Sequence, residues 1–283
     1  MPVGLTHLRS QIEQALRGRV TAPFDYHDRS AAENVTTGID ELDLLSGGFP
    51  RGALTEVFGP GSSGRATLFI SALSVRTANE EECALIDAGD SFDPASAQAA
   101  GADLSKLLWI RCRRIEQALR ATDLILQGGG FGFVCVDLGG VSQEAARKIP
   151  LDTWFRFRRA VENTRTVLLA LEQESNAKTC ASLVLKLAPG RILWSSVKQN
   201  ENGRIQSGGM LERPFARLLD GVDVRAEVVR SRVKPVTRLE FRGNHLQAGT
   251  NGVRTQEATF RANSAWKLSR GRLESQQKQF QSS

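Results

Sequence analysis

A glycine-rich segment between two apolar runs has the spacing of a phosphate-binding loop. It reads GPGSSGRAT and consists of Gly59, Pro60, Gly61, Ser62, Ser63, Gly64, Arg65, Ala66 and Thr67. In a working loop of this kind, backbone N–H groups wrap the phosphates, a lysine follows the last glycine, and the next Ser or Thr holds magnesium. Here Arg65 stands at the lysine position and Ala66 at the hydroxyl position. The segment therefore predicts the backbone loop of a nucleotide site that lacks the lysine amine and the magnesium-binding hydroxyl.

Three further observations bear on this chemistry. The apolar run FGFVCVDL ends in Asp137, where a carboxylate would hold magnesium through water. Thr67 carries a hydroxyl, but it lies one residue beyond the position that holds magnesium. On a helix, its side chain therefore points roughly 100° away from the required direction. The glycines and the helix N-terminus can still attract an anion. We therefore expect weak binding of ATP or ADP at most, and the spacing of the His and Cys residues predicts no metal site.

The elements that must position these residues alternate along the chain. Strands are expected at 54–59, 83–88, 107–112, 131–138 and 166–173, and helices at 65–78, 93–101, 115–127 and 153–163. Strands that are apolar throughout and alternate with helices are typical of a parallel sheet buried on both faces. We predict an α/β fold with a mostly parallel, twisted sheet flanked by helices.

The pattern changes after Gln173. Antiparallel strands that extend the C-terminal edge of the sheet are expected at 181–188, 191–199, 224–232 and 237–243. Residues 1–35 read as an amphipathic helix, at 5–17, followed by a linker. The core domain spans 36–246, and the basic, polar tail 247–283 is expected to be disordered.

Composition limits the classes of function. The chain has 283 residues, is 41% hydrophobic and carries a formal charge of +6, which favours an acidic partner such as nucleic acid. Its four cysteines lie mostly in apolar runs and read as reduced core residues. With no apolar run long enough to span a membrane and no signal peptide, a cytoplasmic location is expected.

The sequence resembles the RecA recombinase family over residues 36–243. The motifs are TTGIDELDLLSGGFPRGALTEVFGPGSSGRAT, CALIDAGDSFDPASAQAAGADLSKLLWIR, FGFVCVDL, LLALEQ and RAEVVRSRVKPVTRLEF. This resemblance implies a RecA-like P-loop NTPase core. It places the catalytic glutamate of the family at Gly89, an adenine-contacting acid at Asp93, the magnesium-holding acid at Asp137 and the γ-phosphate sensor at Gln173. Since glycine cannot act as a base, no catalytic residue is expected.

With its altered phosphate loop and shortened DNA-contacting loops, the chain resembles the ImuA branch of this family. Its segment DTWFRFRRAVENTRTVLLALEQ resembles the arginine-rich helix of that branch. That resemblance implies an accessory role in DNA repair and in SOS, damage-induced translesion synthesis. The implied partners are translesion polymerase factors, namely an ImuB-like protein and an error-prone polymerase, or RecA itself. Contact with single-stranded DNA and self-association are also implied, and contact with a membrane is not.

Two groups of basic residues are candidate contacts with DNA or a partner. Arg156, Arg158 and Arg159 lie among the aromatic residues of WFRFRRAVENTR, and Arg230, Arg232 and Lys234 lie in the strand-rich C-terminal part. Arginines among aromatics can neutralise phosphates and stack on bases. The alternative is an amphipathic helix whose aromatics enter the core. The strand arginines could equally protect a sheet edge from aggregation.

Two other functions remain open at this stage. A divergent, DNA-dependent RecA-type ATPase would need Arg65 to replace the lysine and Asp90 to replace the missing base. A cell-division inhibitor of the SulA type would share a RecA-like fold without a nucleotide site.

Overall fold

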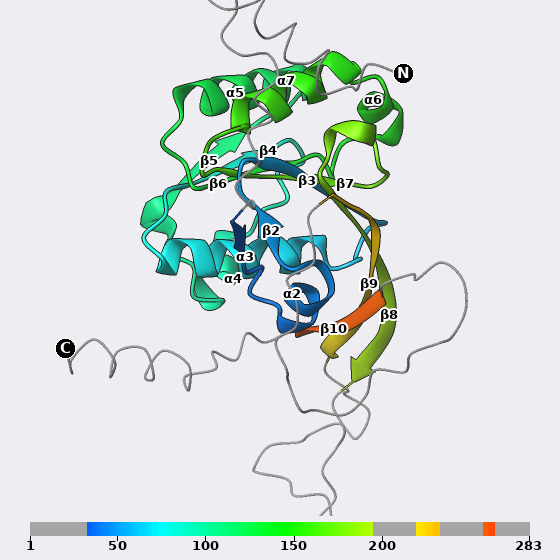
Figure 1. Ribbon diagram of the computed structural model, residues 1–283. Coiled ribbons are helices and arrows are strands. Elements are labelled where there is room, and N and C mark those ends of the chain that lie inside the picture. The colour runs from blue at the N-terminus through cyan, green and yellow to red at the C-terminus, as the bar shows by residue number, and fades with distance from the viewer. Residues whose placement is uncertain (1–32, 195–218, 233–256, 264–283) are drawn as a thin grey trace, which may run out of the picture. The chain divides into compact units, whose positions relative to one another are not determined.

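The computed structural model describes residues 33–194, 219–232 and 257–263, and its centre is one large sheet (Figure 1). The strand order is β10-β9-β8-β3-β7-β6-β4-β5. The strands are β3 (Ala53–Phe58), β4 (Cys83–Asp87), β5 (Leu107–Arg111), β6 (Phe133–Asp137), β7 (Val167–Glu172), β8 (Leu183–Trp194), β9 (Leu219–Ser231) and β10 (Glu257–Asn263). The six strands from β8 to β5 are parallel, and β9 and β10 are antiparallel. The predicted α/β class with a mostly parallel sheet is confirmed.

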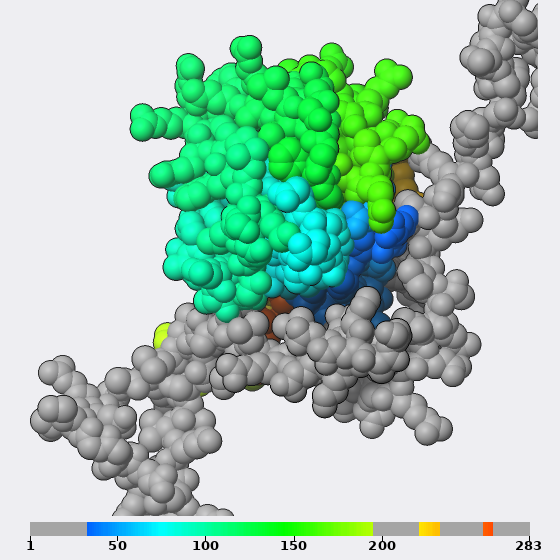
Figure 2. All heavy atoms as spheres, turned by 90° about the vertical axis from the view of Figure 1, so that its left-hand side faces the viewer, coloured from blue at the N-terminus to red at the C-terminus, as the bar shows by residue number. Residues whose placement is uncertain are grey.

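Helices cover both faces of the parallel part of the sheet (Figure 1). One face carries α3 (Arg65–Ala78) and α4 (Pro94–Ala99), and the other carries α5 (Ile115–Gly128) and α7 (Leu151–Val161). The short elements are β1 (Asn34–Val35), α2 (Asp40–Ser46), β2 (Phe49–Pro50), η1 (Leu104–Lys106), α6 (Gln143–Arg147) and η2 (Lys178–Cys180). Figure 2 views the molecule from the side of the edge strand β5, with the green surface of α5 above it.

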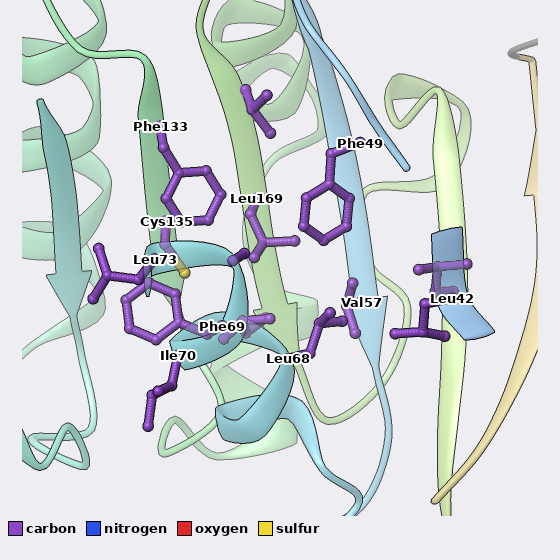
Figure 3. Close-up of a cluster of buried hydrophobic side chains, with 14 of the residues drawn as sticks. Leu42, Phe49, Val57, Leu68, Phe69, Ile70, Leu73, Phe133, Cys135 and Leu169 are labelled. Atoms are coloured by element: carbon purple, nitrogen blue, oxygen red, sulfur yellow. The ribbon is translucent and has the colours of Figure 1, made fainter. Parts of the chain in front are cut away.

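Alternation along each strand divides the apolar residues between two cores. In β6, Phe133 and Cys135 face α3, whereas Val134 and Val136 face α5 and α7. On the α3 side, the rings of Phe133 and Phe69 are stacked with centroids 6.1 Å apart (Figure 3). Both faces are therefore buried, which explains why the central strands read as uninterrupted apolar runs.

Three predictions for the C-terminal part of the sheet are wrong. The runs at 181–188 and 191–194 form the single strand β8, and its pairing with β9 is irregular between Pro189 and Ile192. In addition, β8 pairs in parallel with β3, so only β9 and β10 are antiparallel. The expected disorder of 247–283 is wrong for Glu257–Asn263, because these residues form β10.

Several expectations fall on other parts of the chain. The helix at 5–17 and the strand at 237–243 lie outside the described residues. No helix within the described ranges combines the length and apolar character needed to cross a membrane.

The pairing of β10 with β9 predicts that β10 stabilises the fold. Phe260 is 3% exposed and belongs to the core on the α3 side. We expect Phe260→Ala to lower the free energy of unfolding by about 3 kcal/mol, measured by urea denaturation. The neighbouring, exposed Thr259 provides a matched control, and Thr259→Ala should change stability little. Equal stabilities of wild type and Phe260→Ala would contradict a packed β10.

Candidate nucleotide site

The phosphate-loop sequence follows β3 and leads directly into α3. Gly64 is the N-cap of α3 and has a φ of 89°, a left-handed conformation that suits glycine. A Cβ at this position would also lie 2.7 Å from Cγ2 of Val224 in β9. Ser63 is buried, and its hydroxyl has no hydrogen-bond partner among the described residues. The loop is thus packed against the antiparallel extension of the sheet.

The side chain of Arg65 lies at the carboxyl ends of β6 and β7. A Cβ on Gly139, just beyond β6, would lie 2.6 Å from Nη1 of Arg65. That nitrogen is buried and makes no hydrogen bond within the described chain. Burial lowers the pKa of Arg65, and the charges of Asp137 and Glu172 act in the opposite direction. Arg65 therefore places its positive charge beside the carboxylates that end the central strands.

Asp137 ends β6 with both of its oxygens engaged. The backbone N–H of Gly139 donates to Oδ1 at 2.7 Å, and the hydroxyl of Ser91 donates to Oδ2 at 3.2 Å. Burial raises the pKa of Asp137, and the nearby Arg65 opposes that rise. The carboxylate expected to hold magnesium is bound by protein donors and balanced by a protein cation.

At Gly89, where the missing base would stand, the nearby space is occupied by backbone atoms. A Cβ on Gly89 would lie 2.7 Å from Cα of Gly140, and a Cβ on Gly140 would lie 2.5 Å from Cα of Gly89. Asp87, at the end of β4, accepts hydrogen bonds from the N–H groups of Gly89 and Ser91 and holds the turn in place. The loops after β4 and β6 therefore meet where a glutamate side chain would have to pass.

Two acidic candidates of this region are used elsewhere. Asp90, the proposed replacement for the base, forms two hydrogen bonds of 2.6 Å with Arg111 on the edge strand β5. Asp93 is the N-cap of α4 and accepts from the N–H groups of Ala95 and Ser96. Both carboxylates are thus held by partners outside the phosphate loop.

A buried pair of glutamates that the sequence patterns did not predict lies behind the site. Glu56 in β3 and Glu172 at the end of β7 are both fully buried. Burial, followed by the charge of Glu56, raises the pKa of Glu172 to about 8. At neutral pH, Glu172 thus carries a proton. The sequence signal was a single acidic residue within each apolar strand, at positions where an unpaired charge is costly.

These interactions also determine the path of the chain after β7. Glu56 accepts from the N–H groups of Asn176 and Ala177 and from the hydroxyl of Ser175. Gln173 donates from Nε2 to the carbonyl oxygens of Gly139 at 2.9 Å and Val141 at 3.3 Å. The amide at the expected γ-phosphate position is therefore hydrogen-bonded to the loop after β6.

The structure separates the basic candidates. Arg156 makes two hydrogen bonds with Asp123 of α5, and Arg158 lies 3.8 Å from Glu162. Arg159 is exposed, Arg230 donates to the carbonyl of Lys178, and Lys234 lies outside the described residues. The aromatics Trp154 and Phe157 are buried, as the amphipathic-helix alternative predicts.

The cysteines and the acidic residues offer no other site. All four cysteines are buried and unpaired, and burial raises the pKa of each thiol. Within the described ranges, no group of three or more His, Cys, Asp or Glu side chains is placed to hold a metal ion.

The site as a whole brings together the phosphate loop, Asp137 and Gln173, as the sequence indicates. The residues do not fit magnesium-dependent hydrolysis: Ala66 has no oxygen for the metal, both oxygens of Asp137 have protein donors, and Gly89 supplies no base. The backbone N–H groups of the loop and the start of α3 retain a means of attracting an anion.

Comparisons with known proteins show a likeness to RecA over part of the chain. Residues 6–145 match the RecA N-terminal domain family. Proteins named Protein RecA from Acinetobacter baumannii strains AYE and SDF are 33% identical to the chain over 130 residues, which is 45% of this chain and 37% of each relative. The matched segment thus spans little more than a third of these relatives. Over that segment the chain is a distant homologue of RecA.

The buried glutamate pair predicts a pH-dependent stability. Because folding raises the pKa of Glu172 from its usual 4.5 to about 8, the native state binds an extra proton between these values. The free energy of unfolding should therefore fall as pH rises from about 4.5 to about 8, by on the order of 5 kcal/mol. Glu172→Gln should reduce this fall and be more stable than wild type above pH 8, as measured by urea denaturation.

The exposed Glu144 provides a control, since Glu144→Gln should leave the pH profile unchanged. An unaltered profile in Glu172→Gln would contradict the assignment of the proton to Glu172.

The contact between Gly89 and Gly140 predicts that a side chain is not tolerated there. Gly89→Ala should lower the free energy of unfolding by about 1–3 kcal/mol, because the new Cβ meets backbone atoms that cannot rotate away. The matched control is Gly128→Ala, because a Cβ at Gly128 meets no atom within 4 Å and the variant tests only the loss of a glycine. A Gly89→Glu variant as stable as wild type would show that this position still has room for a base.

Proposed function

We propose that this chain, a distant homologue of RecA over the residues that build the phosphate loop, is an accessory protein of DNA repair that does not hydrolyse ATP. The observation that supports this proposal is the approach of Gly89 to Gly140, at 2.7 Å for an added Cβ. The position that would carry the general base has no side chain and no space for one. General-base catalysis contributes roughly 10²–10⁴ in rate, so its loss is severe by itself.

The arrangement of charges around Arg65 also supports the proposal. Arg65 is longer than lysine and multidentate, and its guanidinium lies beside Asp137 rather than free in the loop. A nucleotide phosphate would compete with Asp137 for this cation. Weak, magnesium-independent binding of ATP or ADP at the loop is compatible with that arrangement, and turnover is not.

Within DNA repair, we assign the chain to an ImuA-like role in SOS, damage-induced translesion synthesis. The altered loop and the arginine-rich α7 support this assignment. The partners proposed on this basis are an ImuB-like protein and an error-prone polymerase, or RecA. The chain would act through protein contacts, which do not require a catalytic site.

The ATPase alternative has less support. It requires Asp90 to act as the base, but Asp90 is paired with Arg111 at 2.6 Å, and this pairing lowers its pKa. A carboxylate held ionised by an arginine is a weak base. No observation favours the cell-division inhibitor.

A phosphate-release assay tests the absence of turnover. The full chain is incubated with ATP and magnesium, with and without single-stranded DNA, and we expect no release above background in either case. Asp137→Asn should behave like wild type. Magnesium-dependent release that Asp137→Asn abolishes would overturn the proposal.

A reconstitution experiment tests the accessory role. We expect the full chain to form a stable complex with a purified ImuB-like protein in size-exclusion chromatography, without added nucleotide. Asp137→Asn should keep the complex, because the interaction does not depend on catalysis. Failure to associate with any of the proposed partners would overturn the ImuA-like assignment while leaving the non-hydrolysing site in place.

A further inference from the structure

A cavity lies at the amino ends of the parallel strands, at the end of the sheet opposite the phosphate loop. Its volume is about 580 Å³, and its walls come from the ends of α3, α5 and α7 and from the segments that lead on into β4, β6 and β7. Cavities of roughly 300–1,000 Å³ are typical of ligand sites. This cavity, here called the amino-end cavity, is separate from the nucleotide site, because no residue of the phosphate loop lines it.

The floor of the amino-end cavity is apolar. Leu126 of α5, Val134 of β6 and Val161 of α7 line it, and each is at most 9% exposed. Ile125 and Phe131 also line it and are partly buried against the same core cluster. An apolar group that enters the cavity would therefore be removed from water by the existing core.

One wall of the cavity, here called the glycine wall, presents backbone rather than side chains. Gly129 and Gly130 have φ values of 65° and 88°, and a Cβ on either residue would meet no atom within 4 Å. The N–H groups of Gly130 and Phe131 make no hydrogen bond among the described residues. The backbone of a ligand can therefore approach this wall closely and find two donors there.

Two arginines that line the cavity share one carboxylate oxygen. Nε of Arg51 is 3.6 Å from Oε2 of Glu33, and Nη2 of Arg165 is 3.4 Å from the same atom. Both distances exceed that of an ordinary N–H···O hydrogen bond. Nε of Arg51 has no hydrogen-bond partner among the described residues, although the side chain of Arg51 is only 9% exposed. The side chain of Glu33 is 59% exposed and is free to turn into water, so it marks a carboxylate position that it fills poorly.

Other charges around the cavity are balanced within the protein or screened by water. Ion pairs join Glu80 with Lys106, and Glu81 with Arg51 and Arg76. Glu82, which also lines the cavity, is exposed, and water screens its charge. Because the carboxyl ends of α3, α5 and α7 carry partial negative charges here, a carboxylate would depend on Arg51 and Arg165 for its binding.

We propose that the amino-end cavity binds the C-terminal residue of a peptide chain, with the terminal carboxylate between Arg51 and Arg165 in place of Glu33. The last side chain is apolar and lies on the floor of the cavity, and the backbone carbonyl before it accepts from the glycine wall. A fatty acid offers the same carboxylate and an apolar chain but leaves the donors of the glycine wall unpaired. The proposal does not rest on the function proposed above, because it uses no residue of the nucleotide site.

Fluorescence anisotropy tests this inference on the full chain, with labelled peptides GSGAL, GSGAF and GSGAV as probes. We expect at least one of them to bind, and the same peptide with a C-terminal amide should have a Kd at least about tenfold higher, because the amide lacks the negative charge. Arg165→Gln should raise the Kd of the free-acid peptide about tenfold. Glu33→Gln should lower that Kd several-fold, because it removes the competing carboxylate.

The matched control is Arg159→Gln, which removes an exposed arginine of α7 that does not line the cavity. Its Kd should equal that of wild type, and circular dichroism should show that all variants are folded. Four outcomes would overturn the inference: no binding of any free-acid peptide, equal binding of acid and amide, equal weakening by Arg159→Gln and Arg165→Gln, or no tightening by Glu33→Gln. Displacement of the probe by octanoate at lower concentration than by unlabelled peptide would also overturn it and would assign the cavity to a small carboxylic acid.

Discussion

The guanidinium of Arg65 brings a positive charge to the carboxyl ends of the central strands, and the surrounding groups are arranged to balance it. An ion removed from water is costly unless opposite charge and hydrogen bonds replace the lost hydration. Asp137 provides the opposite charge, and the proton on Glu172 prevents a second negative charge from accumulating beside it. At this end of the sheet, the charge of Arg65 is thus balanced within the protein itself.

This arrangement shows how a phosphate-loop fold can balance its buried charges with its own side chains. In a working site, the bound nucleotide and metal neutralise the carboxylates and fill the space between the loops. Here Arg65 takes over the neutralisation, and the backbone contact between Gly89 and Gly140 fills part of the space. The fold does not depend on nucleotide chemistry, since the sheet requires only that the charged and polar groups at its strand ends have partners.

Sequence patterns predicted most of the parallel sheet, because strands buried on both faces must be apolar throughout and the helices between them have strong periodicity. The patterns failed at β8, where two apolar runs separated by Pro189 and Gly190 form one strand. They also failed at β10, whose short run EATFRAN carries little apolar content and depends on β9 for its structure. Such long-range pairing overrides local composition.

The residues of the candidate site could be predicted from the sequence, but the contacts between them could not. The spacing of the loop identified Arg65 and Ala66, and the strand end identified Asp137. No pattern indicated that Asp90 would bind Arg111 or that Gln173 would bind the loop after β6, because these partners are set by the three-dimensional path of the chain.

The place of β10 has a consequence for how the protein is made. Among the described strands, β9 has β8 on one side and obtains a neighbour on the other side only from β10, which begins at Glu257. A ribosome must therefore synthesise the chain at least as far as β10 before this pairing can form. Until then, β9 presents an open strand edge, the kind of surface at which unfinished chains join one another. For this protein, the synthesis of β10 is therefore also the step that protects the open edge of β9.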